Sequence, residues 1–192
     1  MNPRVSLVAI MQDEMPYVER WYDALRGHCF DEVVVVDGGS QDETSDWLMS
    51  RGVRVVPRPF KGDFSAQRNA VEELARNDWV FHLDADEIFS PKLLTDVREV
   101  AAALDRRGRD CAGIPRLNFL DDHLQAGRGH QGLDFQYRLK KRALYWSGRV
   151  HESVAERQSV ELDIAEGFYL LHMKSRVRHD ARNAYYGTLE LA

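Results

Sequence analysis

Three carboxylates follow an apolar run in the segment WVFHLDADEIF, residues 79–89. Asp84, Asp86 and Glu87 crowd negative charge at the end of a predicted strand, where like charges repel unless a cation, a proton or water relieves them. In an extended segment residues i and i+2 point to the same side, so Asp84 and Asp86 are expected to aim at one point. Such oxygens suit Mg²⁺ or Mn²⁺, which take further ligands from water and substrate phosphates. The segment therefore predicts a divalent-cation site, although a solvated acidic turn before the helix at Pro91 also explains the triplet alone.

The alternation of apolar and amphipathic segments predicts the elements that position this triplet. The first half of the chain is expected to follow the order β-α-β-α-β-α-β, and continuous apolar strands separated by amphipathic helices are typical of a mostly parallel sheet covered on both faces. After a helix at 91–108, the second half predicts mixed or antiparallel strands at 111–120, 133–141 and 167–173. The expected strands of the first half are 4–11, 31–37, 53–59 and 78–87, and the expected helices are 17–27, 42–52 and 63–77, the last capped by Asp63 or Ser65.

Ligands of a parallel α/β sheet bind beyond the carboxyl ends of its strands. By this rule Gln12 and Asp13 after the first strand, and Asp37 after the second, are expected to lie near the acidic triplet. The glycines that follow Asp37 allow close backbone approach. Its carboxylate is therefore a candidate to bind a nucleobase or ribose, and the alternative is a role in capping the next helix.

Composition limits the class of protein. The chain has 192 residues and a formal net charge of -5, which favours one domain and makes nucleic acid an unlikely partner. Cys29 and Cys111 form no CxxC pair, so we expect buried thiols in a reducing compartment and neither a disulfide framework nor a zinc site. The apolar run VSLVAIM is too short for a signal sequence or a membrane span. A soluble, cytoplasmic protein is expected.

The segment from Arg128 to Arg149 interleaves basic residues with Tyr137, Tyr145 and Trp146. It is either an anion-binding surface or the solvated face of alternating strands, and we favour the solvated face for all its charges except Arg138. Trp146 is either part of an acceptor pocket or a core residue.

Four motifs in order carry a resemblance to a known family. They are VVVVDGGSQDET, RPFKGDFSAQRNAVEELARNDWVFHLDADE, LDFQYRLKKR and GRVHESV. Together they resemble the family 2 glycosyltransferases of the GT-A fold, particularly small bacterial enzymes similar to lipopolysaccharide-core glucosyltransferases. The resemblance implies one α/β domain over residues 1–192, with a mostly parallel central sheet. Residues 1–90 would bind a nucleotide sugar and residues 91–192 would form a mixed, acceptor-side half.

The resemblance also implies roles for single residues. At the first nucleotide-contacting strand end the family often has Asn before its acidic residue, and Asp13 stands there instead. Asp37 matches the aspartate that holds the base, and Arg68 matches a basic residue near the base and diphosphate. Asp84 and Asp86 match the DxD pair, with Asp86 as the first metal ligand. These positions imply an Mg²⁺ or Mn²⁺ cofactor and a nucleotide-diphosphate sugar donor, with a UDP-sugar favoured.

An inverting transfer needs a base for the proton of the acceptor hydroxyl, and a carboxylate within hydrogen-bond reach is the simplest one. Asp134 resembles the acidic residue of the family motif before its xxR stretch, and Glu152 is the second candidate. His151 is a further candidate for a metal or diphosphate contact, although a lone histidine is more often structural.

The resulting hypothesis is a metal-dependent, inverting glycosyltransferase that acts on a saccharide or lipid-linked saccharide acceptor, with peripheral contact to the inner face of the membrane. Two alternatives remain. A non-catalytic nucleotide- or sugar-binding module would keep Asp37 and Asp86 without needing Asp134 or Glu152. A DxD-type phosphotransferase would carry its aspartate pair on the first strand, whereas the pair here lies in the middle of the chain.

Overall fold

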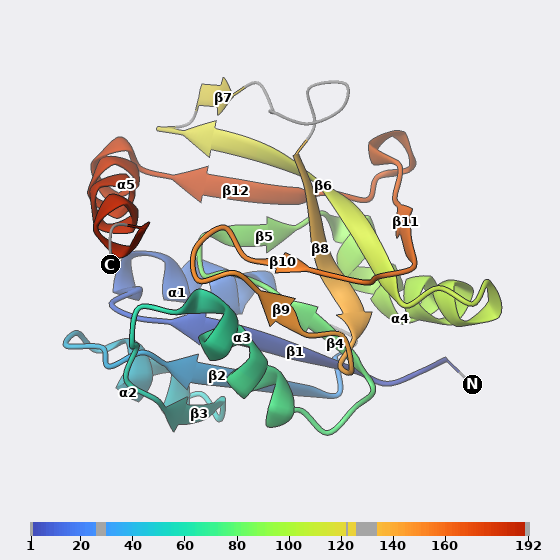
Figure 1. Ribbon diagram of the computed structural model, residues 1–192, viewed down its shortest axis with the longest axis horizontal. Helices are drawn as coiled ribbons and strands as arrows, with labels where there is room; N and C mark the ends of the chain where they lie inside the picture. Colours follow the sequence, from blue (N-terminus) through green and yellow to red (C-terminus); the bar gives the residue numbers. More distant parts are fainter. Residues whose placement is uncertain (1, 26–29, 122, 126–133, 191–192) are drawn as a thin grey trace.

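The computed structural model describes residues 2–25, 30–121, 123–125 and 134–190 (Figure 1). Its main sheet has the strand order β3-β2-β1-β4-β8-β6-β12-β5, with β7 and β11 each paired to β6. The strands are β1 (Val5–Met11), β2 (Glu32–Asp37), β3 (Arg54–Pro57), β4 (Trp79–His82), β5 (Glu87–Phe89), β6 (Cys111–Leu120), β7 (His123–Gln125), β8 (Asp134–Lys141), β11 (Ser159–Glu161) and β12 (Leu170–Lys174). The helices are α1 (Met15–Ala24), α2 (Thr44–Met49), α3 (Phe64–Glu73), α4 (Pro91–Arg106), the 3₁₀ helix η2 (Ile164–Glu166) and α5 (Arg176–Glu190), and β9 (Trp146–Ser147) pairs with β10 (Ser153–Val154) in a second, two-stranded sheet.

The pairing of the strands changes from parallel to mixed where β4 meets β8. Strands β3, β2, β1 and β4 run parallel, as the alternating pattern of the first half predicts. Strand β8 pairs antiparallel with both β4 and β6, and β12 then lies parallel to β6 and antiparallel to β5. Strands from the predicted halves 1–90 and 91–192 therefore share one sheet, with a parallel part and a mixed part.

Helices cover both faces of the parallel part, so its strands are buried on both sides (Figure 1). Along β1, Leu7 belongs to the larger apolar cluster with Trp21 of α1 and Leu93 of α4. Its neighbour Val8 belongs to the smaller cluster on the other face, with Val71 of α3. Successive side chains of a strand alternate between faces, and this explains why a continuous apolar run is needed here.

The helix starts agree with local capping chemistry. The Asp63 carboxylate accepts a hydrogen bond from the Ala66 backbone N–H, so Asp63 is the cap of α3. The Ser90 hydroxyl accepts from the Leu93 N–H, and Pro91 fills the first helical position of α4. These caps fix the start of α3, which carries Arg68, and the exit of the chain from the acidic triplet.

The structure corrects, for Lys140 of β8, the prediction that the charged residues between Arg128 and Arg149 other than Arg138 face solvent. Lys140 is fully buried, and its ammonium donates to the Glu72 carboxylate at 2.5 Å and to the Leu144 carbonyl oxygen at 2.5 Å. The indole N–H of Trp146, a buried residue, donates to the same carboxylate at 2.6 Å. The strand is enclosed on both faces at this end, and a charged residue there requires a buried partner.

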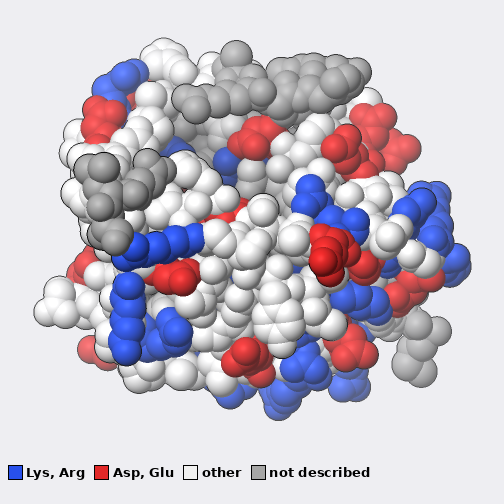
Figure 2. All heavy atoms as spheres, in the orientation of Figure 1, with Lys and Arg blue, Asp and Glu red and all other residues white. Residues whose placement is uncertain are grey.

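Two remaining predictions concern the cysteines and the membrane. Cys111 is buried, and burial raises the pKa of its thiol to about 12, whereas Cys29 lies outside the described residues. Among the described residues, none of the helices has the length and apolar character needed to cross a bilayer. On the face drawn in Figure 2, acidic and basic side chains are interspersed where residues are coloured.

Candidate active site

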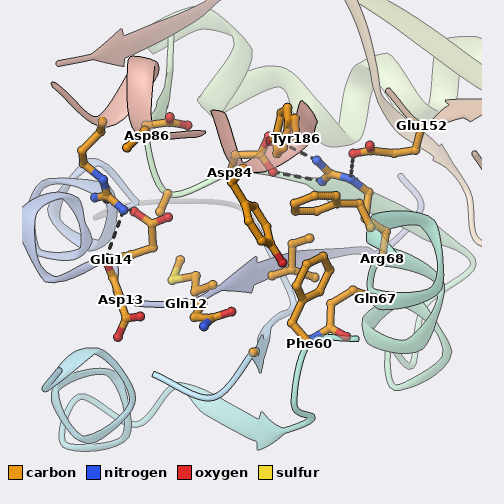
Figure 3. A pocket seen from close by; sticks show the side chains of 18 residues that line it. Gln12, Asp13, Glu14, Phe60, Gln67, Arg68, Asp84, Asp86, Glu152 and Tyr186 are labelled. Carbon is orange, nitrogen blue, oxygen red and sulfur yellow. Dashed lines mark hydrogen bonds and ion pairs between the residues drawn. The ribbon is translucent and has the colours of Figure 1, made fainter. Parts of the chain in front are cut away.

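A cavity of about 580 Å³ opens at the carboxyl ends of β1, β2 and β4 (Figure 3). Its wall combines the residues after β1, the β4–β5 turn, the start of α3 and one face of α5. Five of the predicted site residues line it: Asp13, Arg68, Asp84, Asp86 and Glu152. The other three, Asp37, Asp134 and His151, are not among its lining residues. The cavity thus lies beyond the strand ends, as the rule predicts. Most of the predicted residues come together in its wall.

Arg68 connects two acidic segments that are far apart in sequence. Its guanidinium donates to both oxygens of Asp84, with Nη1–Oδ1 at 2.9 Å and Nη2–Oδ2 at 3.3 Å. Its Nε donates to Oε1 of Glu152 at 2.5 Å. Burial alone would lower the pKa of this side chain, but the attraction of the two carboxylates outweighs it and raises the pKa. Arg68 is therefore a permanently charged group that fixes one wall of the cavity.

Asp84 and Asp86 do not aim at one point, contrary to the prediction for an extended segment. Strand β4 ends at His82, and both aspartates lie in the turn before β5. Asp84 also accepts from Nη2 of Arg138 at 2.5 Å, and the two arginines hold the pKa of Asp84 well below its ordinary value although burial acts to raise it. Figure 3 shows Asp84 with Arg68 on one side of the cavity and Asp86 on the other.

Glu87, the third acidic residue of the triplet, is a buried structural group. It begins β5, has no exposed surface, and accepts from Arg116 at 2.9 Å and from Arg138 at 2.9 Å. Its other oxygen accepts from the Asp84 backbone N–H at 3.2 Å. The positive charge that the crowded carboxylates require is thus supplied in large part by arginines of β6 and β8.

Asp86 lies beside His172, a residue that the sequence analysis did not single out. The His172 Nε2 is 3.3 Å from Oδ2 of Asp86, and both residues are only 3 % exposed. The Asp86 backbone oxygen accepts from the Met173 N–H at 2.8 Å, which ties β12 to the turn. The available signal in the sequence was a histidine inside the apolar strand segment GFYLLHM.

The Asp37 carboxylate accepts hydrogen bonds from the turn that follows it. One carboxylate oxygen accepts from the backbone N–H groups of Gly39 and Ser40, each at 3.0 Å, and the other accepts from the Ser40 hydroxyl at 2.5 Å. Gly39 has φ of +105°, a conformation that glycine adopts readily. Asp37 thus stabilises its own turn and does not cap the next helix, α2, whose N-cap is Glu43. Its contact with a nucleobase stays a prediction.

The other predicted residues outside the cavity are held by neighbours. Asp134 accepts from Arg116 through two nitrogens, Nε at 3.1 Å and Nη2 at 2.5 Å. Burial acts to raise the pKa of Asp134, but the charge of Arg116 and three side-chain hydrogen bonds lower it. The His151 ring packs edge-on against Tyr186, with centroids 6.1 Å apart. No group of three or more His, Cys, Asp or Glu side chains within the described ranges is arranged to hold a metal ion.

Helix α5 closes one side of the cavity. Arg178 pairs with Glu14 at 2.9 Å and donates to the backbone oxygen of Asp13 at 3.1 Å, which anchors the helix to the end of β1. Further along, Tyr186 packs against Phe64 of α3 with ring centroids 5.4 Å apart. The contribution of a C-terminal helix to the strand-end site was not predicted.

Comparisons with known proteins agree with this geometry. The glycosyltransferase SunS of Bacillus subtilis is 26 % identical over 153 residues, which are 79 % of this chain and 35 % of that protein. An uncharacterised glycosyltransferase of Rickettsia bellii is 31 % identical over 103 residues, 54 % of this chain and 34 % of that protein. The chain thus spans about a third of the length of these relatives.

Among solved structures, S. aureus TarS 1-349 in complex with UDP superposes with a TM-score of 0.65 at 16 % identity, covering 90 % of this chain and 61 % of that one. This likeness, together with the parallel strands and the strand-end cavity, identifies the fold as the GT-A type of nucleotide-sugar transferases. Residues 6–155 match the family described as "Glycosyl transferase family 2". The chain therefore belongs to glycosyltransferase family 2, a family of transferase enzymes.

Proposed function

We propose that this chain transfers a sugar from a nucleoside-diphosphate donor, with a uridine nucleotide favoured, to a saccharide or lipid-linked saccharide acceptor with inversion at the sugar carbon. One observation carries the proposal: a cavity at the ends of the parallel strands is lined by both Asp86 and the Arg68–Glu152 pair. Its volume of about 580 Å³ lies in the usual range for small-molecule sites. The UDP complex of the structurally similar TarS supports the choice of uridine.

A divalent metal fits the donor atoms at Asp86. A carboxylate oxygen and an imidazole nitrogen are both ligands for Mn²⁺-type ions, and Asp86 and His172 place them 3.3 Å apart. Two adjacent ligands of one octahedral ion, each about 2.1 Å from it, are about 3 Å apart, close to this separation. We therefore assign the metal to Asp86 and His172, because both oxygens of Asp84 bind arginines and His151 packs on Tyr186. When bound, such an ion stabilises the negative charge that develops on the departing diphosphate.

Glu152 is the better-placed base for the acceptor. It lines the cavity, whereas Asp134 does not, and we therefore assign the role of base to Glu152. As the bond from the acceptor oxygen to the sugar carbon forms and the bond to phosphate breaks, the hydroxyl proton passes to Glu152 and the nucleoside diphosphate leaves. Burial raises the pKa of Glu152, but Arg68 lowers it below its ordinary value. Arg68 thus keeps this carboxylate ionised and oriented before the acceptor binds.

Calorimetric titration of UDP, with Mn²⁺ and with EDTA, tests the donor site. We expect measurable affinity with Mn²⁺, a strong reduction in EDTA, and the same reduction for Asp86→Asn in Mn²⁺. Equal UDP affinity under both conditions would refute metal-dependent binding.

The matched variant Glu152→Gln separates catalysis from donor binding. We expect it to bind UDP with Mn²⁺ as wild type does, while transfer or hydrolysis of a UDP-sugar falls about 10²-fold or more. A protein that binds UDP-sugars but turns over none of them, with a panel of saccharide acceptors, would instead be a nucleotide-sugar-binding module.

A further inference from the structure

We propose that Asn118 and Asp134 fix the imidazole tautomer of His172, so that its Nε2 lone pair faces Asp86 and the cation site there. The inference rests on the metal assignment of the proposed function. It makes Asn118 and Asp134 positioning residues, because they act on the cation site through His172.

Three neighbouring strands bring these side chains together by their register. His172 of β12 lies directly opposite Asn118 of the parallel strand β6. Two residues earlier on β6, Arg116 lies opposite Asp134 at the start of the antiparallel strand β8. Residues i and i+2 of a strand share a face, so Arg116 and Asn118 both approach Asp134 from one side. The contacts run in sequence from Asp134 to Asn118, from Asn118 to His172, and from His172 to Asp86.

The first link depends on the charge of Asp134. Arg116 donates to its Oδ2 from two nitrogens, at 3.1 Å and 2.5 Å, and Gln136 donates to its Oδ1 at 2.9 Å. An ionised carboxylate has no proton to give, so it acts only as an acceptor. Any polar group that hydrogen-bonds to Asp134 must therefore be the donor.

This requirement sets the orientation of the Asn118 amide. Its Nδ2 faces Oδ2 of Asp134 at 3.4 Å, because the opposite orientation would place two acceptors against each other. The amide oxygen then points the other way, and it lies 2.7 Å from Nδ1 of His172. An amide oxygen can only accept, so Nδ1 of His172 must carry the proton.

A neutral imidazole has one N–H and one lone pair. With the proton on Nδ1, the lone pair on Nε2 faces the Asp86 carboxylate oxygen at 3.3 Å. Two buried acceptors at this separation are unfavourable unless a cation lies with them, and both side chains are almost completely enclosed. Histidine ligands of metals commonly donate their second nitrogen to an oxygen in this way. The interactions beyond His172 thus prepare its neutral form to bind a cation, and they disfavour the neutral tautomer that would donate from Nε2 to Asp86.

The tautomer is directly measurable in the metal-free protein. We would record imidazole ¹⁵N spectra at pH 8, where an ordinary histidine is neutral, and assign His172 with the variant His172→Gln. Wild type is expected to show Nδ1–H. Asn118→Leu, which removes the amide, is expected to lose this preference and to reduce Mn²⁺ affinity, measured by electron paramagnetic resonance, by roughly 10- to 100-fold.

An exchange of the two side chains distinguishes positioning from mere packing. Asp134→Asn alone removes the obligatory acceptor, so the Nδ1–H preference and the Mn²⁺ affinity should both weaken. Adding Asn118→Asp restores an acceptor beside Nδ1 and lets the new amide at 134 donate to it, so the double variant should regain both. Gln136→Leu is the matched control: it removes a partner of Asp134 outside the chain of contacts, and both readouts should remain as in wild type.

Either an Nε2–H or a doubly protonated His172 in wild type would overturn the inference, as would unchanged spectra in Asn118→Leu. Failure of the double variant to recover relative to Asp134→Asn would also overturn it. If wild type shows Nδ1–H but binds no Mn²⁺, the metal assignment of the proposed function fails while the tautomer assignment stands.

Discussion

The guanidinium Nε of Arg68 lies 2.5 Å from a carboxylate oxygen of Glu152, although 84 residues separate them in the chain. The same guanidinium binds both oxygens of Asp84. One buried cation thus holds two carboxylates at the wall of the cavity. Its loss would remove the positive charge that Glu152 contacts and would leave Arg138 as the arginine bound to Asp84.

Replacement of Arg68 should therefore be costly. We expect Arg68→Met to lower the free energy of unfolding by about 3–5 kcal/mol, the usual consequence of removing one member of a buried ion pair. Urea denaturation at pH 7 measures the change. Lys61→Met, at an exposed position shortly before α3, serves as the control and should change stability by about 0.5 kcal/mol or less. A loss below about 1 kcal/mol for Arg68→Met would mean that solvent reaches the two carboxylates.

Acid should destabilise the protein through the same residues. The pKa values of Asp84 and Glu152 in the folded protein lie below their ordinary values of 3.8 and 4.5, so the unfolded chain binds protons first as the pH falls. Their contribution is complete above these ordinary values and is lost as the pH falls toward the folded values. Urea midpoints should be nearly constant from pH 7 to about 5 and then decrease. Glu152→Gln should show a shallower decrease, and a parallel curve would exclude Glu152 as a source of the effect.

The buried pair of Lys140 and Glu72 should behave as a coupled unit. Lys140→Met leaves the Glu72 carboxylate buried without its cation, and we expect a loss of about 3–5 kcal/mol. The double variant Lys140→Met/Glu72→Gln removes both charges and keeps an acceptor for the Trp146 indole. It should be more stable than Lys140→Met alone, with a coupling energy of about 1–3 kcal/mol in a double-mutant cycle measured by urea denaturation. Additive effects would contradict this account.

Asp37 offers a test of turn formation against base recognition. Asp37→Ala removes the acceptor of the Gly39 and Ser40 N–H groups and should cost about 1–3 kcal/mol in stability. Asp37→Asn keeps an acceptor oxygen for the turn, so we expect near-wild-type stability. If Asp37 also holds the base, as the family resemblance implies, this stable variant binds UDP more weakly than wild type in calorimetry. Unchanged UDP affinity would leave Asp37 as a turn residue only.

The parts of the fold that follow from local pattern were predictable. The apolar run of β1, the alternation of helices with strands up to residue 82, and the strand at 111–120 all lie where the sequence indicates them. The short strands β9, β10 and β11 were not predicted, because two or three residues carry no periodicity and long-range pairing defines them. Lys140 was misjudged for a related reason: residues 138–140 are buried in succession, which strict alternation does not allow.

The site was predictable only in its location and acidic character. That Asp84 and Asp86 would lie at the cavity follows from the rule for strand ends, whereas the family resemblance placed Arg68 there. Arg116 lies on β6, His172 lies on β12, and the remaining partners lie on α5. The positions of these three elements depend on the register of the mixed part of the sheet. No local feature of the sequence specifies that register, so the division of the triplet into an arginine-bound and a histidine-bound aspartate required the structure.

The arginines that neutralise Glu87 are synthesised after it, and this sets the order in which parts of the new chain can fold. Arg116 follows Glu87 by 29 residues and Arg138 follows it by 51. At a synthesis rate of about 5–20 residues per second, Arg138 is made roughly 3 to 10 seconds after Glu87. Until both arginines emerge from the ribosome, enclosing this carboxylate would bury an uncompensated charge, so the acidic segment remains hydrated and the sheet stays open at β4. The parallel part can form earlier, but the nascent chain cannot close its acidic strand end until β6 and β8 have arrived.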